Sequence, residues 1–226
     1  MTTLELDKLA DEFIEARGGS ACFKNVDNFN HAICTSVNQE SVHGVPSKNK
    51  ILRNGDIVSL DCGVRYPAKS GMCTDAARTV GVGEISDEAR ELIDITKKCF
   101  EVATKDLRSG MKVARIGERI EDFVGGRYGI VDTYFGHGIG KSVHENPLIP
   151  NFNVAKHKSV SKKVLDFSDT VLKDGDVICI EPMINVGTGD LRTARDGWTA
   201  ITTDGELAAH HENTMIIWRD RVEIVT

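Results

Sequence analysis

Five side chains of this sequence combine residue types and positions that favour metal chemistry. Asp61 and Glu181 each end a run of Val, Ile and Leu residues, and a buried carboxylate is costly unless it is paired or metal-bound. The others are Asp75 in CTDAART, Glu212 in HHENTMIIW and His137 in GHGIG. Four carboxylates and an imidazole form an oxygen-rich set that suits two divalent ions with shared carboxylates. Such ions, typically about 3.5–4 Å apart, lower the pKa of bound water and polarise a substrate carbonyl.

Three of these residues also have a structural explanation when each is taken alone. Asp75 could cap a turn, His137 could be a hydrogen-bonded core histidine, and Glu212 could pair with a surface lysine. The combination in one chain favours a functional site over a set of separate structural roles.

An internal repeat connects two of the carboxylates. The segment Leu52–Asp61 (LRNGDIVSLD) aligns with Leu172–Glu181 (LKDGDVICIE), and the differences are mostly conservative. Each copy predicts a turn, a buried strand and a carboxylate in the same register. Chance similarity between two Gly-Asp turns is the alternative, but the length of the match favours duplication. We therefore expect the two carboxylates to face one cleft across a pseudo-twofold axis, within about 10 Å of each other.

Apolar periodicity and capping signals define the helices. Thr2 and Glu5 predict a capping box, Ser86 predicts a second N-cap, and Gly125 follows a third apolar pattern. The predicted helices cover residues 2–17, 86–107 and 113–124.

Strand-like runs alternate with these helices, which predicts an α/β arrangement. The stretch 152–170 is polar and contains Lys156, Lys158, Lys162 and Lys163, so we expect a solvated loop without a functional role. The predicted strands cover residues 55–64, 176–186, 213–218 and 221–225.

Composition argues against a nucleic-acid-binding, membrane-spanning or secreted protein. A formal charge of −6, from 28 basic and 34 acidic residues, gives no electrostatic reason to expect nucleic-acid binding. The sequence has no apolar run of about 18 residues, and its first residues lack the pattern of a secretory signal. Six cysteines without a CxxC pair indicate reduced thiols, so we expect a cytoplasmic protein without a membrane partner.

The motifs together resemble one known family. TLELDKLADEFI, ICTSVN, VHGVP, LRNGDIVSLDCG, TDAART, GHGIGKSVHENP, ICIEPMIN, RTARDGWT and HHENT resemble the type I methionine aminopeptidases from Thr3 to the end of the chain. The resemblance implies the α+β "pita-bread" fold, with two pseudo-symmetric halves around a central antiparallel sheet and helices on the outer face. It also implies a single catalytic domain over residues 1–226.

The resemblance assigns roles to individual residues. His43 of VHG is expected near the amino end of the substrate, and His144 of the HENP motif is expected to bind the substrate carbonyl or the developing oxyanion. Glu181 is expected to relay the proton of the attacking water, while Asp75 and Glu212 are expected to bridge two ions. The implied metal ligands are Asp61, Asp75, His137, Glu181 and Glu212, and the implied ions are two of Co, Mn, Fe or Zn.

Departures from the family pattern cluster at the expected methionine pocket. Val26 stands where a tyrosine is usual, and Val143 stands where a phenylalanine is common. Two missing aromatic side chains predict a weaker preference for methionine over leucine or norleucine. The gap from Asp61 to Asp75 is also a few residues longer than usual, which predicts an extended hairpin. The remaining pocket residues would be Phe29, Cys34, Val143 and Trp198.

The sequence therefore predicts an enzyme that removes an N-terminal methionine when the second residue is small. Its expected partners are the N-termini of nascent polypeptides, with the ribosome as one place of encounter, and the expected state is a monomer. A proline-specific dipeptidase or aminopeptidase of the same fold is the first alternative. A non-catalytic pita-bread domain that binds proteins is the second.

Overall fold

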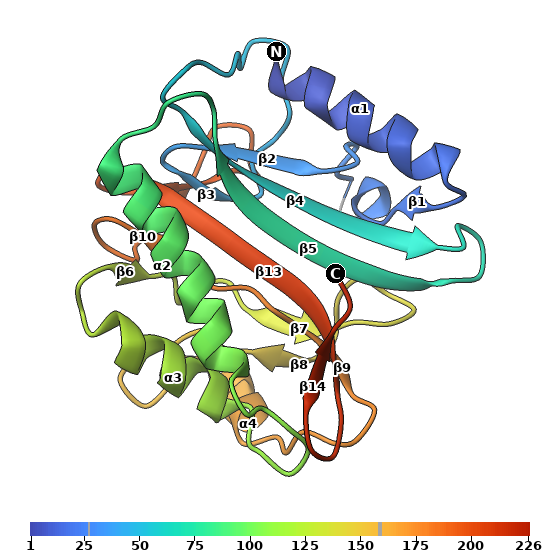
Figure 1. Ribbon diagram of the computed structural model, residues 1–226, viewed down its shortest axis with the longest axis vertical. Coiled ribbons are helices and arrows are strands. Elements are labelled where there is room, and N and C mark those ends of the chain that lie inside the picture. The colour runs from blue at the N-terminus through green and yellow to red at the C-terminus, as the bar shows by residue number, and fades with distance from the viewer. Residues whose placement is uncertain (27, 158–159) are drawn as a thin grey trace.

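The computed structural model describes residues 1–26, 28–157 and 160–226, and it confirms the predicted mixed α/β architecture (Figure 1). A large antiparallel sheet follows the path β1-β4-β5-β13-β9-β7-β8, and β2, β10, β6 and β14 attach to it. A small second sheet has the order β11-β12-β3. The strands are β1 Ser20–Ala21, β2 Cys34–Val37, β3 Glu40–Val42, β4 Ile57–Tyr66, β5 Met72–Gly81, β6 Gly129–Ile130, β7 Gly136–Gly138, β8 Glu145–Ile149, β9 Val177–Ile180, β10 Met183–Asn185, β11 Leu191–Thr193, β12 Ala200–Thr202, β13 Ala208–Ile217 and β14 Val222–Ile224.

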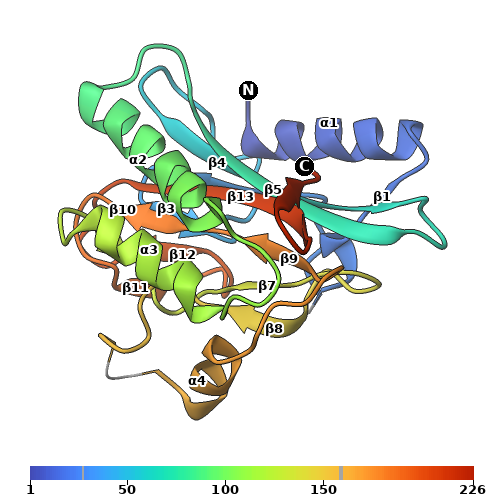
Figure 2. The same ribbon diagram turned by 60° about the horizontal axis from the view of Figure 1, so that its bottom comes forward.

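The predicted helices are confirmed, with small differences at their ends. Thr2 and Glu5 form the expected capping box of α1, and the Ser86 side chain accepts a hydrogen bond from the Ala89 N–H at the start of α2. Gly125 ends α3 in the left-handed conformation (φ 60°). Helices α1 and α2 lie on the outer face of the sheet, with α3 against α2 (Figure 2). The helices are α1 Thr3–Ala16, α2 Asp87–Thr104, α3 Ala114–Val124 and α4 Lys162–Ser168, and a short 3₁₀ helix covers Phe23–Asn25.

The two copies of the internal repeat form the same turn. The backbone N–H of Arg53 donates to Asp56 Oδ2 (2.7 Å), and the N–H of Lys173 donates to Asp176 Oδ2 at the same distance. Each turn contains a glycine with positive φ, and each is followed by a strand of the central sheet, β4 or β9. These strands pair with β5 and β13, which pair with each other at the centre. The predicted pseudo-twofold arrangement of two strand pairs is therefore present.

Two predicted strands had wrong boundaries, one in the second copy of the repeat and one in the last hairpin of the described chain, and both differences matter for the site. The run predicted over 176–186 is divided into β9 and β10 at Glu181 and Pro182, because proline has no N–H for the ladder. The strand predicted to begin at residue 213 begins at Ala208, so Glu212 lies inside β13. The strand β5 was missing from the predicted strands, but it forms the second arm of the predicted extended hairpin and pairs with β4 from Ile57↔Gly81 to Tyr66↔Met72.

The prediction of a solvated loop over 152–170 was wrong. Phe152 is buried, and α4 forms where the Ser161 side chain accepts a hydrogen bond from the Val164 N–H. Burial of Val164 anchors this short helix, which packs beside β8 (Figure 2). Lys156, Lys162 and Lys163 are exposed, whereas Lys158 lies outside the described residues.

Candidate active site

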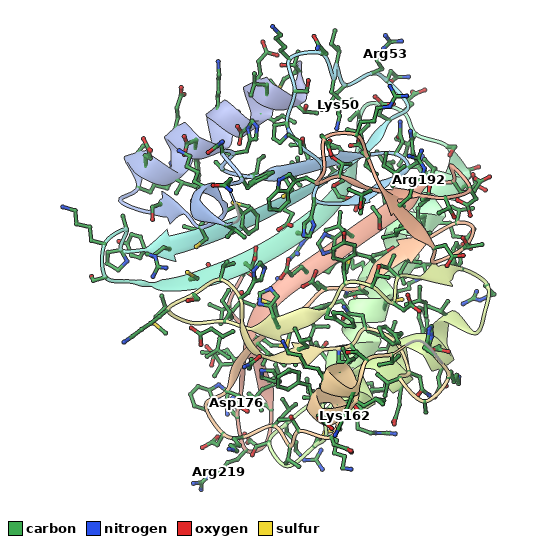
Figure 3. The ribbon with its side chains drawn as sticks, turned by 180° about the vertical axis from the view of Figure 1, so that it is seen from behind. Lys50, Arg53, Lys162, Asp176, Arg192 and Arg219 are labelled. Carbon is green, nitrogen blue, oxygen red and sulfur yellow. The ribbon has the colours of Figure 1, made fainter. Side chains whose placement is uncertain are left out.

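A cavity of about 520 Å³ opens on the face of the central sheet that lies opposite α2. Figure 3 views the molecule from behind, and its labelled charged residues, among them Arg53, Asp176 and Arg219, lie at the periphery. The two repeated turns, marked by Arg53 and Asp176, lie at opposite ends of the molecule. The strands that follow them therefore approach the middle of the sheet from opposite ends.

The structure brings all five predicted metal ligands into this cavity. Strand alternation explains their common face, because successive side chains of a strand point to opposite sides of the sheet. Leu60 and Cys62 of β4 pack in the layer beneath α1, whereas Asp61 between them faces the cavity. The central strands supply the others, with Asp75 on β5, Glu212 on β13, His137 on β7 and Glu181 directly after β9.

The distances between these groups are those of a compact cluster. His137 Nε2 lies 3.7 Å from Glu181 Oε1 and 3.8 Å from Glu212 Oε1. Asp61, Asp75 and Glu212 each offer an oxygen within 4.8 Å of the other two. Asp61 and Glu181 line the same cavity, so the prediction drawn from the repeat, that both carboxylates face one cleft, is confirmed.

Burial raises the pKa of every acid of the cluster, and like charge adds to the effect at Asp75, Glu181 and Glu212. Burial raises the pKa of Asp75 well above its ordinary value, and the charges of Glu212 and Asp61 raise it further. Burial, with neighbouring carboxylates, does the same to the pKa of Glu181 and Glu212. Burial also lowers the pKa of His137 to about 4, which keeps the imidazole neutral, the form that binds metals.

The donor set fits divalent cations. Asp61 Oδ1 and Glu212 Oε1 are buried and have no hydrogen-bond partner among the described residues, a costly state for carboxylate oxygens. A cation between the acids would satisfy these oxygens and offset the mutual repulsion. Carboxylates with one imidazole match the preferences of Mn, Fe, Co and Zn.

Two more predicted residues, His43 and His144, line the same cavity. The His144 ring meets the His137 ring edge-on, with centroids 4.7 Å apart. His43 has a positive φ (59°), and its ring is edge-on to Tyr134, with centroids 5.0 Å apart. Gly44 permits this turn, because a Cβ there would lie 2.3 Å from the Thr35 carbonyl oxygen.

The expected methionine pocket forms one wall of the cavity. Phe29, Cys34 and Trp198 line it, and the rings of Phe29 and Trp198 have centroids 5.2 Å apart. Val143 is buried in the same apolar cluster without lining the cavity. Phe23, which the sequence analysis did not single out, also lines this wall and packs in the cluster. The pocket therefore contains an aromatic ring that the motif comparison did not count.

His210 and Lys163 are further site residues that the sequence analysis missed. His210 is buried on β13, two residues before Glu212, and alternation along a correctly placed strand would have identified it. Lys163 lines the cavity from α4, the helix that was predicted to be a loop. Only the fold brings Lys163 to the site, since nothing in its local sequence indicates a role.

Comparison with known proteins agrees with this geometry. The family model described as metallopeptidase family M24 matches residues 1–218. This chain belongs to that family. Membership of this metallopeptidase family implies the use of a divalent metal, in agreement with the cluster of acids and imidazole.

Individual curated proteins and solved structures resemble the chain over nearly its whole length. The methionine aminopeptidase of Clostridium acetobutylicum is 41% identical over 227 aligned residues, which cover 100% of this chain and 85% of the relative. The crystal structure of methionine aminopeptidase from Rickettsia prowazekii superposes with a TM-score of 0.88 at 32% identity and covers 99% of this chain and 85% of that one. The prolidase of Pyrococcus furiosus shares the fold, with a TM-score of 0.72 at 22% identity, and covers 99% of this chain and 55% of that one. Within the described residues of this M24 chain, no helix has the length and apolar content needed to span a bilayer.

Substitution of Asp75 tests the cluster. Asp75→Asn should lower the bound metal after dialysis, because a carboxylate shared by the cluster loses its charge. The metal-free protein should remain folded, since a group whose pKa is raised by folding costs stability once ionised, and asparagine removes that cost at neutral pH. Metal analysis and thermal unfolding with and without EDTA measure both effects. Asp94→Asn, on the exposed face of α2, is the control, and full metal content in Asp75→Asn would contradict the assignment.

Proposed function

We propose that this chain hydrolyses the peptide bond after an N-terminal methionine when the second residue is small. One observation carries the proposal: a single cavity joins the cluster of four carboxylates and His137 to an apolar pocket with three aromatic rings. The pocket accounts for a long apolar first side chain, and the cluster accounts for hydrolysis beside it. The similarity to proteins named methionine aminopeptidase supports the same substrate.

The five residues of the cluster, Asp75 and Glu212 among them, would hold two divalent ions. When bound, such a pair supplies Lewis acidity that activates water and polarises the scissile carbonyl. The choice among Co, Mn, Fe and Zn is set by availability, because all four suit this donor set.

The remaining residues position the substrate and move protons. Phe23, Phe29 and Trp198 hold the first side chain, which directs the scissile bond toward the carboxylates. His144, on the His137 side of the cavity, donates a hydrogen bond to the carbonyl oxygen as negative charge develops there. Glu181, whose pKa burial raises, takes the proton of the attacking water and transfers it to the leaving amine. His43, held between Tyr134 and Trp198, lies beside the amino end of the substrate.

The comparisons favour this function over its alternatives. The similarity to the prolidase is a similarity of fold alone, whereas the methionine aminopeptidases are closer in both sequence and structure. A non-catalytic domain would have no need for five buried ligands facing one cavity. We further propose one catalytic domain over residues 1–226, acting as a monomer on nascent polypeptides in the cytoplasm.

A cleavage assay distinguishes the candidate functions. The protein, reconstituted with Mn(II) or Fe(II), should release methionine from Met-Ala-Ser and leave Ala-Pro intact. Mass spectrometry of the products measures both reactions. Cleavage of Ala-Pro alone would support the proline-specific alternative, and cleavage of neither peptide by metal-loaded protein would support the non-catalytic one.

Substitution of His144 tests the oxyanion contact. His144→Ala should lower kcat by roughly 10²–10³-fold, the usual loss for one removed oxyanion donor, and leave the metal content unchanged. Steady-state kinetics on Met-Ala-Ser with parallel metal analysis provide the measurement. A rise in KM with unaltered kcat would mean that His144 binds substrate and transition state equally.

The aromatic wall makes a separate prediction about specificity. Phe23→Leu keeps an apolar side chain but removes a ring that can contact the methionine sulfur, a contact of about 0.3–1.5 kcal/mol. The ratio of kcat/KM for methionyl over norleucyl peptides should therefore fall by about 2- to 10-fold. Phe13→Leu, on the exposed face of α1, is the matched control. An unchanged ratio in Phe23→Leu would exclude Phe23 from the pocket.

A further inference from the structure

His210 is a buried imidazole for which the proposed chemistry has no use. Its side chain is 1% exposed, and its Nε2 has no hydrogen-bond partner among the described residues. Burying a polar nitrogen without a hydrogen-bond partner is costly, so a purely structural role does not explain a histidine at this position.

The fold holds His210 firmly toward the cluster. The backbone N–H of His210 donates to Thr79 Oγ1 (2.8 Å), and the Thr79 hydroxyl lies 2.9 Å from the His210 carbonyl oxygen. Ser59 Oγ, 2.7 Å from the same Thr79 oxygen, extends this contact to β4. His211, the next residue of β13, turns to the opposite face and packs against Phe100 of α2, with ring centroids 5.2 Å apart.

Glu181 lies between two imidazoles. Its Oε1 is 3.7 Å from His137 Nε2, and its Oε2 is 3.6 Å from His210 Nε2. Both separations exceed a hydrogen bond, which ends near 3.2 Å. Separations of this size are instead expected between two atoms that bind the same ion, each about 2.0–2.2 Å from it. Glu181, His210 and Glu212 also offer ligand atoms that all lie within 4.8 Å of one another.

We propose that His210 is a sixth ligand of the metal cluster and binds the ion that Glu181 also binds. This inference rests on the proposed metal-dependent function and adds a residue to its ligand set. A second imidazole makes that position richer in nitrogen than the five-residue set alone. It therefore favours Zn, Co and Fe over Mn, since imidazole suits the former ions and carboxylate suits Mn.

The unaltered protein provides the decisive test. Metal-free protein labelled with ¹⁵N-histidine is loaded with ¹¹³Cd(II), and one-bond ¹¹³Cd–¹⁵N couplings are recorded by NMR. Couplings to two histidine nitrogens are expected, one lost in His137→Gln and the other in His210→Gln. Coupling to a single nitrogen in the unaltered protein would overturn the inference and leave the proposed function intact. Failure of the protein to bind any metal would overturn both.

Affinity measurements add an independent readout. In titrations of the metal-free protein with Co(II), His210→Gln should weaken one site at least about 10-fold, because even residues that only orient a ligand typically contribute that much. The matched control is His211→Gln on the opposite face of β13, which should bind Co(II) like the unaltered protein. Thermal unfolding of the metal-free variants checks that each is folded. Equal Co(II) affinity in folded His210→Gln and unaltered protein would contradict the proposal.

Discussion

The burial of several like-charged carboxylates at the centre of one sheet is the constraint on which the rest of this structure depends. Asp75 and Glu212 lie on the two strands that pair at the middle of the sheet, where water cannot screen their repulsion. In the part of the chain that the structure describes, the ion-pair partners of the cluster acids are the imidazoles of His137 and His210, and burial lowers the pKa of both, which favours their uncharged form. The positive charge must therefore come from outside the chain, which agrees with the metal use of the M24 family. Fold and cofactor are in this sense one problem, because bound cations would relieve the repulsion that this arrangement of strands creates.

Much of this organisation could be predicted from the sequence, because the signals are local. A carboxylate after an apolar strand, as at Asp61 and Glu181, is unusual enough to indicate a partner, and the repeated Gly-Asp turn places both strands in equivalent positions. Helix caps such as Thr2 and Ser86 form hydrogen bonds within three residues, so no tertiary information was needed to locate them.

The residues that were missed depend on long-range contacts or on strand boundaries. His210 shares a face with Glu212 only because β13 begins at Ala208, and that boundary is set by pairing with β10 rather than by β propensity. Phe23 reaches the pocket because Gly63 leaves room for its ring; a Cβ at Gly63 would lie 2.7 Å from Phe23 Cε1. A motif comparison that aligns position with position cannot detect an aromatic ring supplied from a different place in the chain.

The long hairpin of β4 and β5 has a consequence for how this chain can change in length. Asp61 and Asp75 face the cavity because both lie at matching positions of a continuous antiparallel register, in which Gly63 pairs with Asp75. The hairpin extends beyond them to Tyr66 and Met72, whose side chains are exposed. Insertions at the tip do not change which face of the sheet the Asp61 and Asp75 side chains point to. The hairpin can therefore become longer or shorter there during evolution. A single residue inserted between Asp61 and Tyr66 without a compensating bulge would instead turn one carboxylate to the opposite face, since side chains alternate along a strand.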